Sequence, residues 1–210
     1  MDEKSIALDI RDGMNVFERL VKRIFDITCS FLALIILSPV FLVVAITLLC
    51  QGDGSVFFKQ ERIGYKGKPF NILKFRTMRA DSESNGEPRL ATVNDERLTK
   101  VGKFLREHHL DELPQLVNVL LGDMSFVGPR PERRYFIEKI RLENPNYDYL
   151  YMIRPGLTSM ATLHNGYTDT MEKMLKRLDM DLEYLQKRSL WLDMKLIFTT
   201  FLFIVNGKKF

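Results

Sequence analysis

The sequence contains little cysteine and little histidine. Among its 210 residues are two cysteines, Cys29 and Cys50, both in or at the edge of an apolar run, and three histidines, two of them adjacent at His108 and His109. The cysteines have neither disulfide-framework nor zinc-site spacing, and the histidine pair has no spaced partner for a metal centre. We therefore expect both cysteines to act as small apolar residues.

Several familiar motifs are absent as well. The chain has no GxSxG turn, no P-loop and no Rossmann glycine fingerprint, which argues against a serine hydrolase and against the common nucleotide-binding loops. Internal repeats and low-complexity tracts are also missing. The basic residues are spread out and match no recognised nucleic-acid motif, so we expect no nucleic-acid partner.

What the chain does contain fits one folded domain, alone or with a membrane element. It is 46% hydrophobic and 28% charged, which fits neither a disordered chain nor a polytopic membrane protein. A net charge of +4 suits nucleic acid, an anionic membrane surface or a phosphorylated substrate without choosing among them.

One long segment, Ile27 to Gly52, carries no charge. A straight helix of this length would cross about 30 Å of hydrocarbon. Ser38-Pro39 lies at its midpoint, however, and proline bends a helix. Basic residues occur on both sides of the run: Arg19, Lys22 and Arg23 before it, and Lys59, Arg62, Lys66 and Lys68 after it.

Because both flanks are basic, the positive-inside rule puts both ends in the cytoplasm. This favours a re-entrant hairpin that dips into one leaflet, with each half about 18 Å long; a kinked spanning helix is the alternative. Residues 1–54 would then form an amphipathic segment and this membrane hairpin. Residues 55–210 would form a catalytic domain on the cytoplasmic face.

The second part of the chain predicts an α+β fold that is mostly helical. Two β-rich stretches flank the turn "GYKGKP" and predict a short β-hairpin. In a strand over residues 70–77, Lys74 and Arg76 would share one face. The polar residues 81–96 predict a loop, and helices are expected near 99–108, 113–121, 132–142 and 170–188.

The C-terminal apolar stretch from Leu196 to Val205 is too short to span a membrane. Trp191 precedes it and two lysines, Lys208 and Lys209, follow it. This arrangement is typical of an amphipathic helix that lies at a lipid surface. A buried C-terminal helix is the alternative.

Two adjacent carboxylates, Asp111 and Glu112, stand just before Pro114 and an apolar run. Proline fits the first turn of a helix, so the pair is expected at or before a helix N-terminus. Asp111 could be a plain N-cap, worth about 1 kcal/mol. Alternatively, helix amides would keep it ionised, and an ionised carboxylate can attack phosphorus to form an acyl-phosphate.

Such an attack brings an anion toward an anionic phosphate, so positive charge is required. A divalent cation shared by Asp111, Glu112 and the phosphates would relieve the repulsion, and oxygen ligands point to Mg²⁺. Arginine binds phosphate oxygens bidentately. Arg106 lies five residues before the pair, and Arg130 sits between two prolines in "GPRPE".

At these residues the chain resembles the bacterial sugar transferases that are monotopic phosphoglycosyl transferases. The resembling segments run in order through nearly the whole chain: "KRIFDI", Ser38-Pro39, "FFKQERIGYKGKPFNILKFRTM", "LTKVGKFLRE", "LDELPQLVNVLLGDMSFVGPRPE", "IRPGLTS" and "SLWLDMKLIF". The resemblance implies transfer of a sugar-1-phosphate from a UDP-sugar to undecaprenyl phosphate with release of UMP. It also implies a small, minimal member at the bacterial inner membrane.

The resemblance assigns roles to individual residues. It implies that Asp111 is the covalent nucleophile and that Glu112 assists with metal or proton handling. Candidate phosphate- or nucleotide-binding residues are Arg106 and Arg130, with Lys59, Lys74 and Arg76 as further candidates on the same face, and Arg154 in "RPGLTS". The product would begin a surface glycan: capsule, exopolysaccharide, O-antigen or glycoprotein glycan. An oligomer is possible.

Two segments depart from the common pattern. His108-His109 replaces small hydroxyl residues before the acid pair, and "MATLHNGYTD" replaces a Trp-Ala-Gln stretch after "RPGLTS". The second departure leaves the identity of the sugar open. A membrane-bound hydrolase of nucleotide-diphosphosugars, using the same acids on water, is the competing enzyme class, and a membrane-anchored scaffold with a basic face is the non-enzymatic one.

Overall fold

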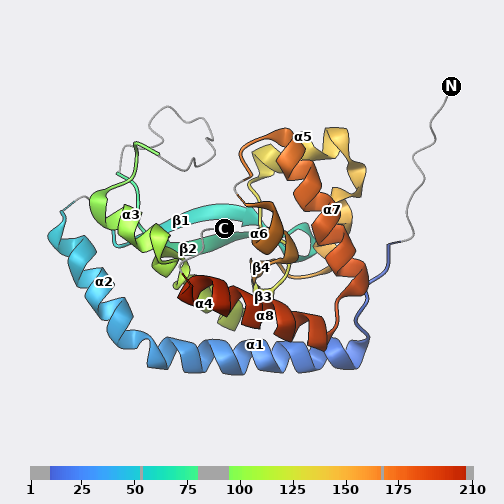
Figure 1. Ribbon diagram of the computed structural model, residues 1–210, viewed down its shortest axis with the longest axis horizontal. Coiled ribbons are helices and arrows are strands. Elements are labelled where there is room, and N and C mark those ends of the chain that lie inside the picture. Colours follow the sequence, from blue (N-terminus) through green and yellow to red (C-terminus); the bar gives the residue numbers. More distant parts are fainter. Residues whose placement is uncertain (1–9, 53, 80–94, 167, 207–210) are drawn as a thin grey trace.

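The computed structural model describes residues 10–52, 54–79, 95–166 and 168–206, and it is mostly helical, at 62% (Figure 1). The longer helices are α1 (Val16–Ile36), α2 (Ser38–Cys50), α7 (Met171–Lys187) and α8 (Leu190–Val205); the shorter ones are α3 (Lys100–Glu107), α4 (Gln115–Leu121), α5 (Arg134–Glu143) and α6 (Met160–Asn165). The 3₁₀ segments are η1 (Tyr65–Gly67), η2 (Leu110–Glu112) and η3 (Pro145–Met152). The strands are β1 (Phe57–Ile63), β2 (Pro69–Phe75), β3 (Ser125–Val127) and β4 (Gly156–Thr158).

These elements confirm the expected mostly helical α+β class and its β-hairpin. Most of the loop predicted over 81–96 lies outside the described residues. The division of the chain after residue 54 stays a prediction. The sequence did not predict β3 and β4, which pair in parallel.

The predicted break in the N-terminal apolar segment is confirmed. α1 and α2 meet at Leu37 with a bend of 60°, and Pro39 occupies the first turn of α2, where its missing N–H costs nothing. Ser38 donates a hydrogen bond from Oγ to the Ile35 carbonyl (2.8 Å) across the bend. Among the described residues, no unbroken helix has the length and apolarity of a membrane span, but this bent pair has them jointly.

α1 carries a row of buried polar residues on one face. Lys22, Asp26 and Ser30 recur every four residues and are all buried, so they lie on one side of the helix. The Lys22 ammonium donates to the Val127 carbonyl (3.0 Å), and the Asp26 carboxylate accepts from the Phe126 N–H (3.1 Å). The other face is apolar and exposed. α1 is therefore fixed to strand β3 by its polar side.

α8 is fixed to the same place by a buried carboxylate. Asp193 forms an ion pair with Lys22 and accepts a hydrogen bond from the Tyr184 hydroxyl of α7 (2.6 Å). Leu196 on the same helix is buried, whereas Phe198 and Phe201 are 62% and 60% exposed. The alternative of a fully buried C-terminal helix is therefore wrong: one face packs inward and the other is an exposed apolar surface.

The β1–β2 hairpin positions the basic residues of the central segment. Its antiparallel register sets Phe58 opposite Lys74 and Lys59 opposite Leu73. Directly paired residues lie on the same side of a sheet and consecutive residues on opposite sides. Lys59 and Lys74 therefore point to opposite faces, so the expectation that they share one is wrong; a one-residue difference in register reverses the face of every side chain.

Candidate active site

The Asp-Glu pair occupies the short turn η2, which His109 introduces. His109 has φ of 55°, in the left-handed region that side chains other than glycine seldom adopt. Asp111 is only 5% exposed. The N-cap of α4 is Pro114, and no side chain caps that helix. The interpretation of Asp111 as a helix cap is therefore wrong.

Two cations surround the second acid. Lys74 donates from Nζ to Glu112 Oε1 at 2.6 Å, and Arg130 donates from Nη2 to the same oxygen at 3.1 Å. Burial would raise the pKa of Glu112, but the charges and hydrogen bonds of Lys74 and Arg130 outweigh it and hold the pKa well below its usual range. Glu112 is therefore a permanent anion at neutral pH.

The first acid has a different environment. Burial raises the pKa of Asp111, and the nearby Glu112 charge adds to this, while Lys74 and Arg106 act in the opposite direction. Burial likewise lowers the pKa of His109, which faces the same charged groups. Two neighbouring carboxyl groups with pKa values displaced in opposite directions are typical of a catalytic pair.

Lys74 reaches Glu112 because Asn118 of α4 ties that helix to β2. The Asn118 side chain accepts from the Leu73 N–H (3.0 Å) and donates to the Asn71 carbonyl (2.8 Å). It is 2% exposed. These two bonds hold α4 against β2 in the way that a neighbouring strand would. They thereby place Lys74, the residue after Leu73, beside the acids.

Arg106 is carried to the site by a close contact between α3 and the end of the hairpin. Thr99 caps α3, and its N–H also donates to the Thr77 carbonyl (3.0 Å). Gly102 lies so near that an added Cβ would stand 1.9 Å from that carbonyl oxygen. One turn later, Arg106 donates from Nε to the Thr77 hydroxyl (3.1 Å).

Arg130 enters from the segment after β3. Its pKa is raised, chiefly by the charge of Glu112. The segment passes close to the start of β4: an added Cβ on Gly156 would lie 2.1 Å from the Gly128 nitrogen. The pairing of β3 with β4 thus brings the Pro-Arg-Pro turn against the acid pair.

The other three candidate phosphate-binding residues lie elsewhere. Lys59 is exposed on the far face of the hairpin. Arg76 is 7% exposed and donates to the Leu48 carbonyl (3.3 Å) near the end of α2, with Nε and Nη1 unpartnered. Arg154 donates to the carbonyl of Gly122 (2.8 Å) at the end of α4 and lies over the Tyr65 ring.

Sequence reasoning missed two residues of the site. Asn118 gave no signal, because a buried amide within an apolar helix stands out only when its partners are known. His109 was considered for metal binding alone. His109 lies beside the acids because its backbone is left-handed, and no local sequence pattern predicts that conformation.

Comparison with known proteins places this site in a family. The family model described as "Bacterial sugar transferase" matches residues 17–207. The "UDP-glucose:undecaprenyl-phosphate glucose-1-phosphate transferase" of Klebsiella pneumoniae is 45% identical over 189 residues, covering 89% of this chain and 40% of the relative.

Two further relatives show how the length varies. The "UDP-N-acetylgalactosamine-undecaprenyl-phosphate N-acetylgalactosaminephosphotransferase" of Aeromonas hydrophila is 38% identical, over 89% of this chain and 44% of that protein. The "Exopolysaccharide production protein PSS" of Rhizobium leguminosarum bv. phaseoli is also 38% identical, over 90% and 98%. The chain thus spans about two fifths of the first two relatives and nearly all of the third. Since the family model covers nearly its whole length, this chain belongs to the bacterial sugar transferase family.

Proposed function

We propose that the protein transfers a sugar-1-phosphate from a UDP-sugar to undecaprenyl phosphate and releases UMP. The observation that carries the proposal is the arrangement of Asp111 and Glu112: a buried carboxyl beside a permanent anion that two cations hold. The names of the relatives, which describe UDP-sugar donors and undecaprenyl-phosphate acceptors, support this donor and this acceptor. The glycan would be a bacterial surface polysaccharide.

Asp111 serves as the nucleophile in this proposal. Its carboxylate oxygen bonds to the phosphorus that carries the sugar, while the bond from that phosphorus to the bridging oxygen breaks and UMP leaves with the electron pair. A phosphate oxygen of undecaprenyl phosphate then attacks the same phosphorus and frees the Asp111 carboxylate. Because burial raises its pKa, Asp111 is a more basic nucleophile than an exposed aspartate.

Arg106 and Arg130 bind phosphate oxygens, and Lys74 moderates the charge of both acids. Arg130 and Lys74 already contact Glu112, so an incoming diphosphate meets positive charge beside the nucleophile without approaching a bare anion. Glu112 fixes the orientation of both cations.

Mg²⁺ is part of this proposal, and the donor set is compatible with it. Among the described residues, no three acids, histidines or cysteines gather into a metal cluster. Mg²⁺ sites, however, often use one or two carboxylates together with waters and substrate phosphates. Asp111 and Glu112 would hold the ion, which would neutralise charge on the transferring phosphate.

Association with the cytoplasmic face of the inner membrane is the remaining element. Exposed apolar side chains lie on α1, α2 and α8, for example Phe17, Ile36, Leu42 and Phe201. A surface of this extent on three helices suits lipid. The bent pair α1–α2 would dip into one leaflet and place the site where a lipid-linked phosphate lies.

The test is UMP release from a panel of UDP-sugars by purified protein in lipid discs, with and without undecaprenyl phosphate and Mg²⁺. We expect release that depends on both, and loss of at least about a thousandfold in Asp111→Asn, which preserves shape but removes the nucleophile. A phosphosugar adduct on Asp111, found by mass spectrometry without acceptor, would identify the intermediate. UMP release that does not depend on undecaprenyl phosphate would instead indicate a nucleotide-diphosphosugar hydrolase.

A further inference from the structure

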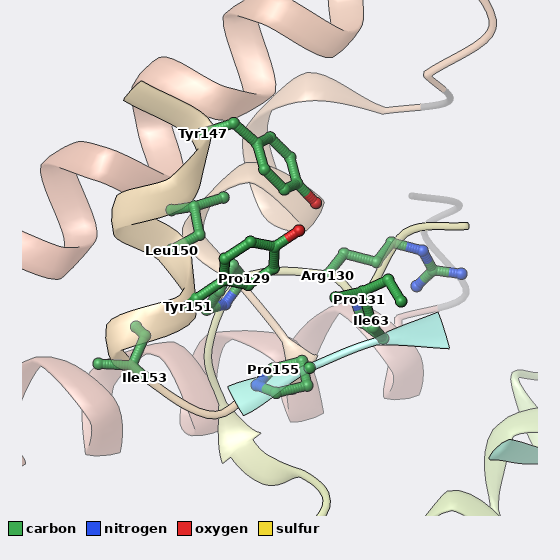
Figure 2. A pocket seen from close by; sticks show the side chains of 10 residues that line it. Ile63, Pro129, Arg130, Pro131, Tyr147, Leu150, Tyr151, Ile153 and Pro155 are labelled. Carbon is green, nitrogen blue, oxygen red and sulfur yellow. The ribbon is translucent and has the colours of Figure 1, made fainter. Parts of the chain in front are cut away.

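Arg130 contacts Glu112 and also lines a hollow next to the acid pair (Figure 2). The hollow holds about 240 Å³ of empty space, part of it open to solvent. Its walls are mostly rings, contributed by Pro129, Pro131, Tyr147, Tyr151 and Pro155, with Ile63, Leu150 and Ile153 between them. A single arginine thus belongs both to the acid site and to an apolar recess.

The size and lining of the hollow restrict what it can accept. The hollow is small and partly open to solvent, so it suits a part of a nucleotide sugar rather than the whole molecule. No carboxylate lines it, and Arg130 is its one charged group. Flat apolar walls with a few polar groups at one side fit a planar, uncharged ring better than a sugar, whose hydroxyls need partners all around.

The aromatic walls are held in place before any ligand arrives. Tyr147 and Tyr151 meet edge to face with ring centroids 5.8 Å apart, and the Arg141 guanidinium lies 5.5 Å from the Tyr151 ring centroid. Tyr147 is 5% exposed. Figure 2 shows both tyrosine hydroxyls directed toward the side on which Arg130 lies. A ring entering the hollow would therefore meet apolar walls and find polar groups beside the arginine.

We propose that this hollow binds the uracil base of the donor, with Arg130 marking the passage from the base to the diphosphate. The proposal rests on the proposed function, because it takes a uridine nucleotide as the donor. The base would contact the rings of Tyr147, Tyr151 and the prolines, while the phosphates extend past Arg130 toward Asp111. Tyr151 is then a binding residue for the nucleobase.

A second hollow, which shares Arg130, Tyr147 and Leu150 with the first, is a poorer site for the donor. Its wall also contains Glu132, Arg177 and Asp181, and Arg177 already pairs with Glu132 and donates to the Thr168 hydroxyl (2.8 Å). Its wall thus contains acid side chains, which the wall of the first hollow lacks. The hollow beside Pro129 and Pro131, whose one charged lining residue is Arg130, suits the donor better.

The experiment uses UMP as the probe and does not require turnover. Saturation-transfer NMR on the full chain in lipid discs should give the strongest signals at the uracil H5 and H6 protons. Tyr151→Leu, which keeps an apolar side chain but removes the ring, should weaken UMP binding about tenfold, since a base stacked on an aromatic side chain depends strongly on it. Inhibition by inorganic pyrophosphate should change less than twofold.

Tyr135→Leu is the matched control, because Tyr135 is a 43% exposed aromatic residue on α5 outside the hollow; its UMP affinity should stay as in the wild type. Tyr151→Phe should retain most of the affinity, which separates ring contact from loss of folding. Equal weakening of UMP and pyrophosphate by Tyr151→Leu would overturn the proposal, as would ribose signals stronger than those of the base.

The two proposals fail separately. If UMP binds through Tyr151 but no acceptor-dependent transfer occurs with any UDP-sugar, the transferase function fails and the base site stands. If transfer occurs and Tyr151→Leu leaves the UMP affinity unchanged, the base site fails and the function stands.

Discussion

At the scale of single residues, the main contrast is between two adjacent acids. Glu112 is held as an anion by Lys74 and Arg130, whereas burial raises the pKa of Asp111. The sequence located the pair and its arginines, because Arg106, the two acids and the Pro-Arg-Pro segment follow one another along the chain in a specific pattern. It could not assign the two environments, since Lys74 joins Glu112 only through long-range packing.

The raised pKa of Asp111 predicts where activity is lost in acid. A carboxyl whose pKa is raised becomes protonated at a higher pH than an ordinary aspartate with its value of 3.8, and a protonated Asp111 cannot act as the proposed nucleophile. The acid limb of single-turnover rate against pH should therefore lie above 3.8. Lys74→Met should move the limb further up, because the Lys74 charge lowers the pKa of Asp111.

The control for that profile is Lys187→Met, which removes a lysine that is 69% exposed on α7 and should leave the limb in place. An acid limb at or below 3.8 in the wild type would contradict the assigned environment of Asp111. So would an unchanged limb in Lys74→Met, provided that the variant still folds.

At the scale of elements, sequence patterns found the helices better than they found their partners. Hydropathy identified the apolar run and its break, but it could not show that Lys22, Asp26 and Ser30 face inward from a helix that begins at Val16. β3 and β4 were missed because three-residue strands carry too short a pattern to recognise. Lys59 was assigned to the wrong face because the hairpin register depends on its turn.

The buried ion pair between α1 and α8 predicts a large stability effect. Asp193→Asn would leave the buried Lys22 ammonium without its counter-charge, and breaking one side of such a pair costs about 3–5 kcal/mol. The matched acid-to-amide control is Glu183→Gln, at an exposed pair with Lys187, where surface pairs contribute about 1 kcal/mol or less. Denaturant unfolding in detergent measures both; equal effects would show that the buried pair does not link the helices.

At the scale of the whole molecule, a buried acid on α7 links stability to pH. Asp181 is 2% exposed, and burial raises its pKa from 3.8 to about 7 despite the opposing charge of Arg177. The folded state then binds the proton more tightly than the unfolded state. The stabilisation that this proton gives is complete below pH 3.8 and is lost as the pH rises through about 7.

Asp181→Asn removes this titration while it preserves the shape of the side chain. Relative to the wild type, the variant should gain about 1 kcal/mol or more between pH 5 and pH 8, since one pKa unit corresponds to about 1.4 kcal/mol. Denaturant midpoints at the two pH values measure this. The control is Asp179→Asn, which removes an exposed carboxylate from the same helix. It distinguishes the effect of losing any negative charge from the effect of losing the titration of the buried Asp181 carboxyl. A pH-independent difference for Asp181→Asn would contradict the prediction.

The polar row on α1 also limits how the protein can be engineered. Deleting the bent helix pair would strip Lys22 from Asp193 and from the Val127 carbonyl, and Asp26 from the Phe126 N–H. The truncated fragment would expose Asp193, the Val127 carbonyl and the Phe126 N–H without the partners that they have on α1. For the same reason an unrelated apolar helix cannot replace α1. A chimera with another helix in this place would have to carry Lys22, Asp26 and Ser30 at the same spacing.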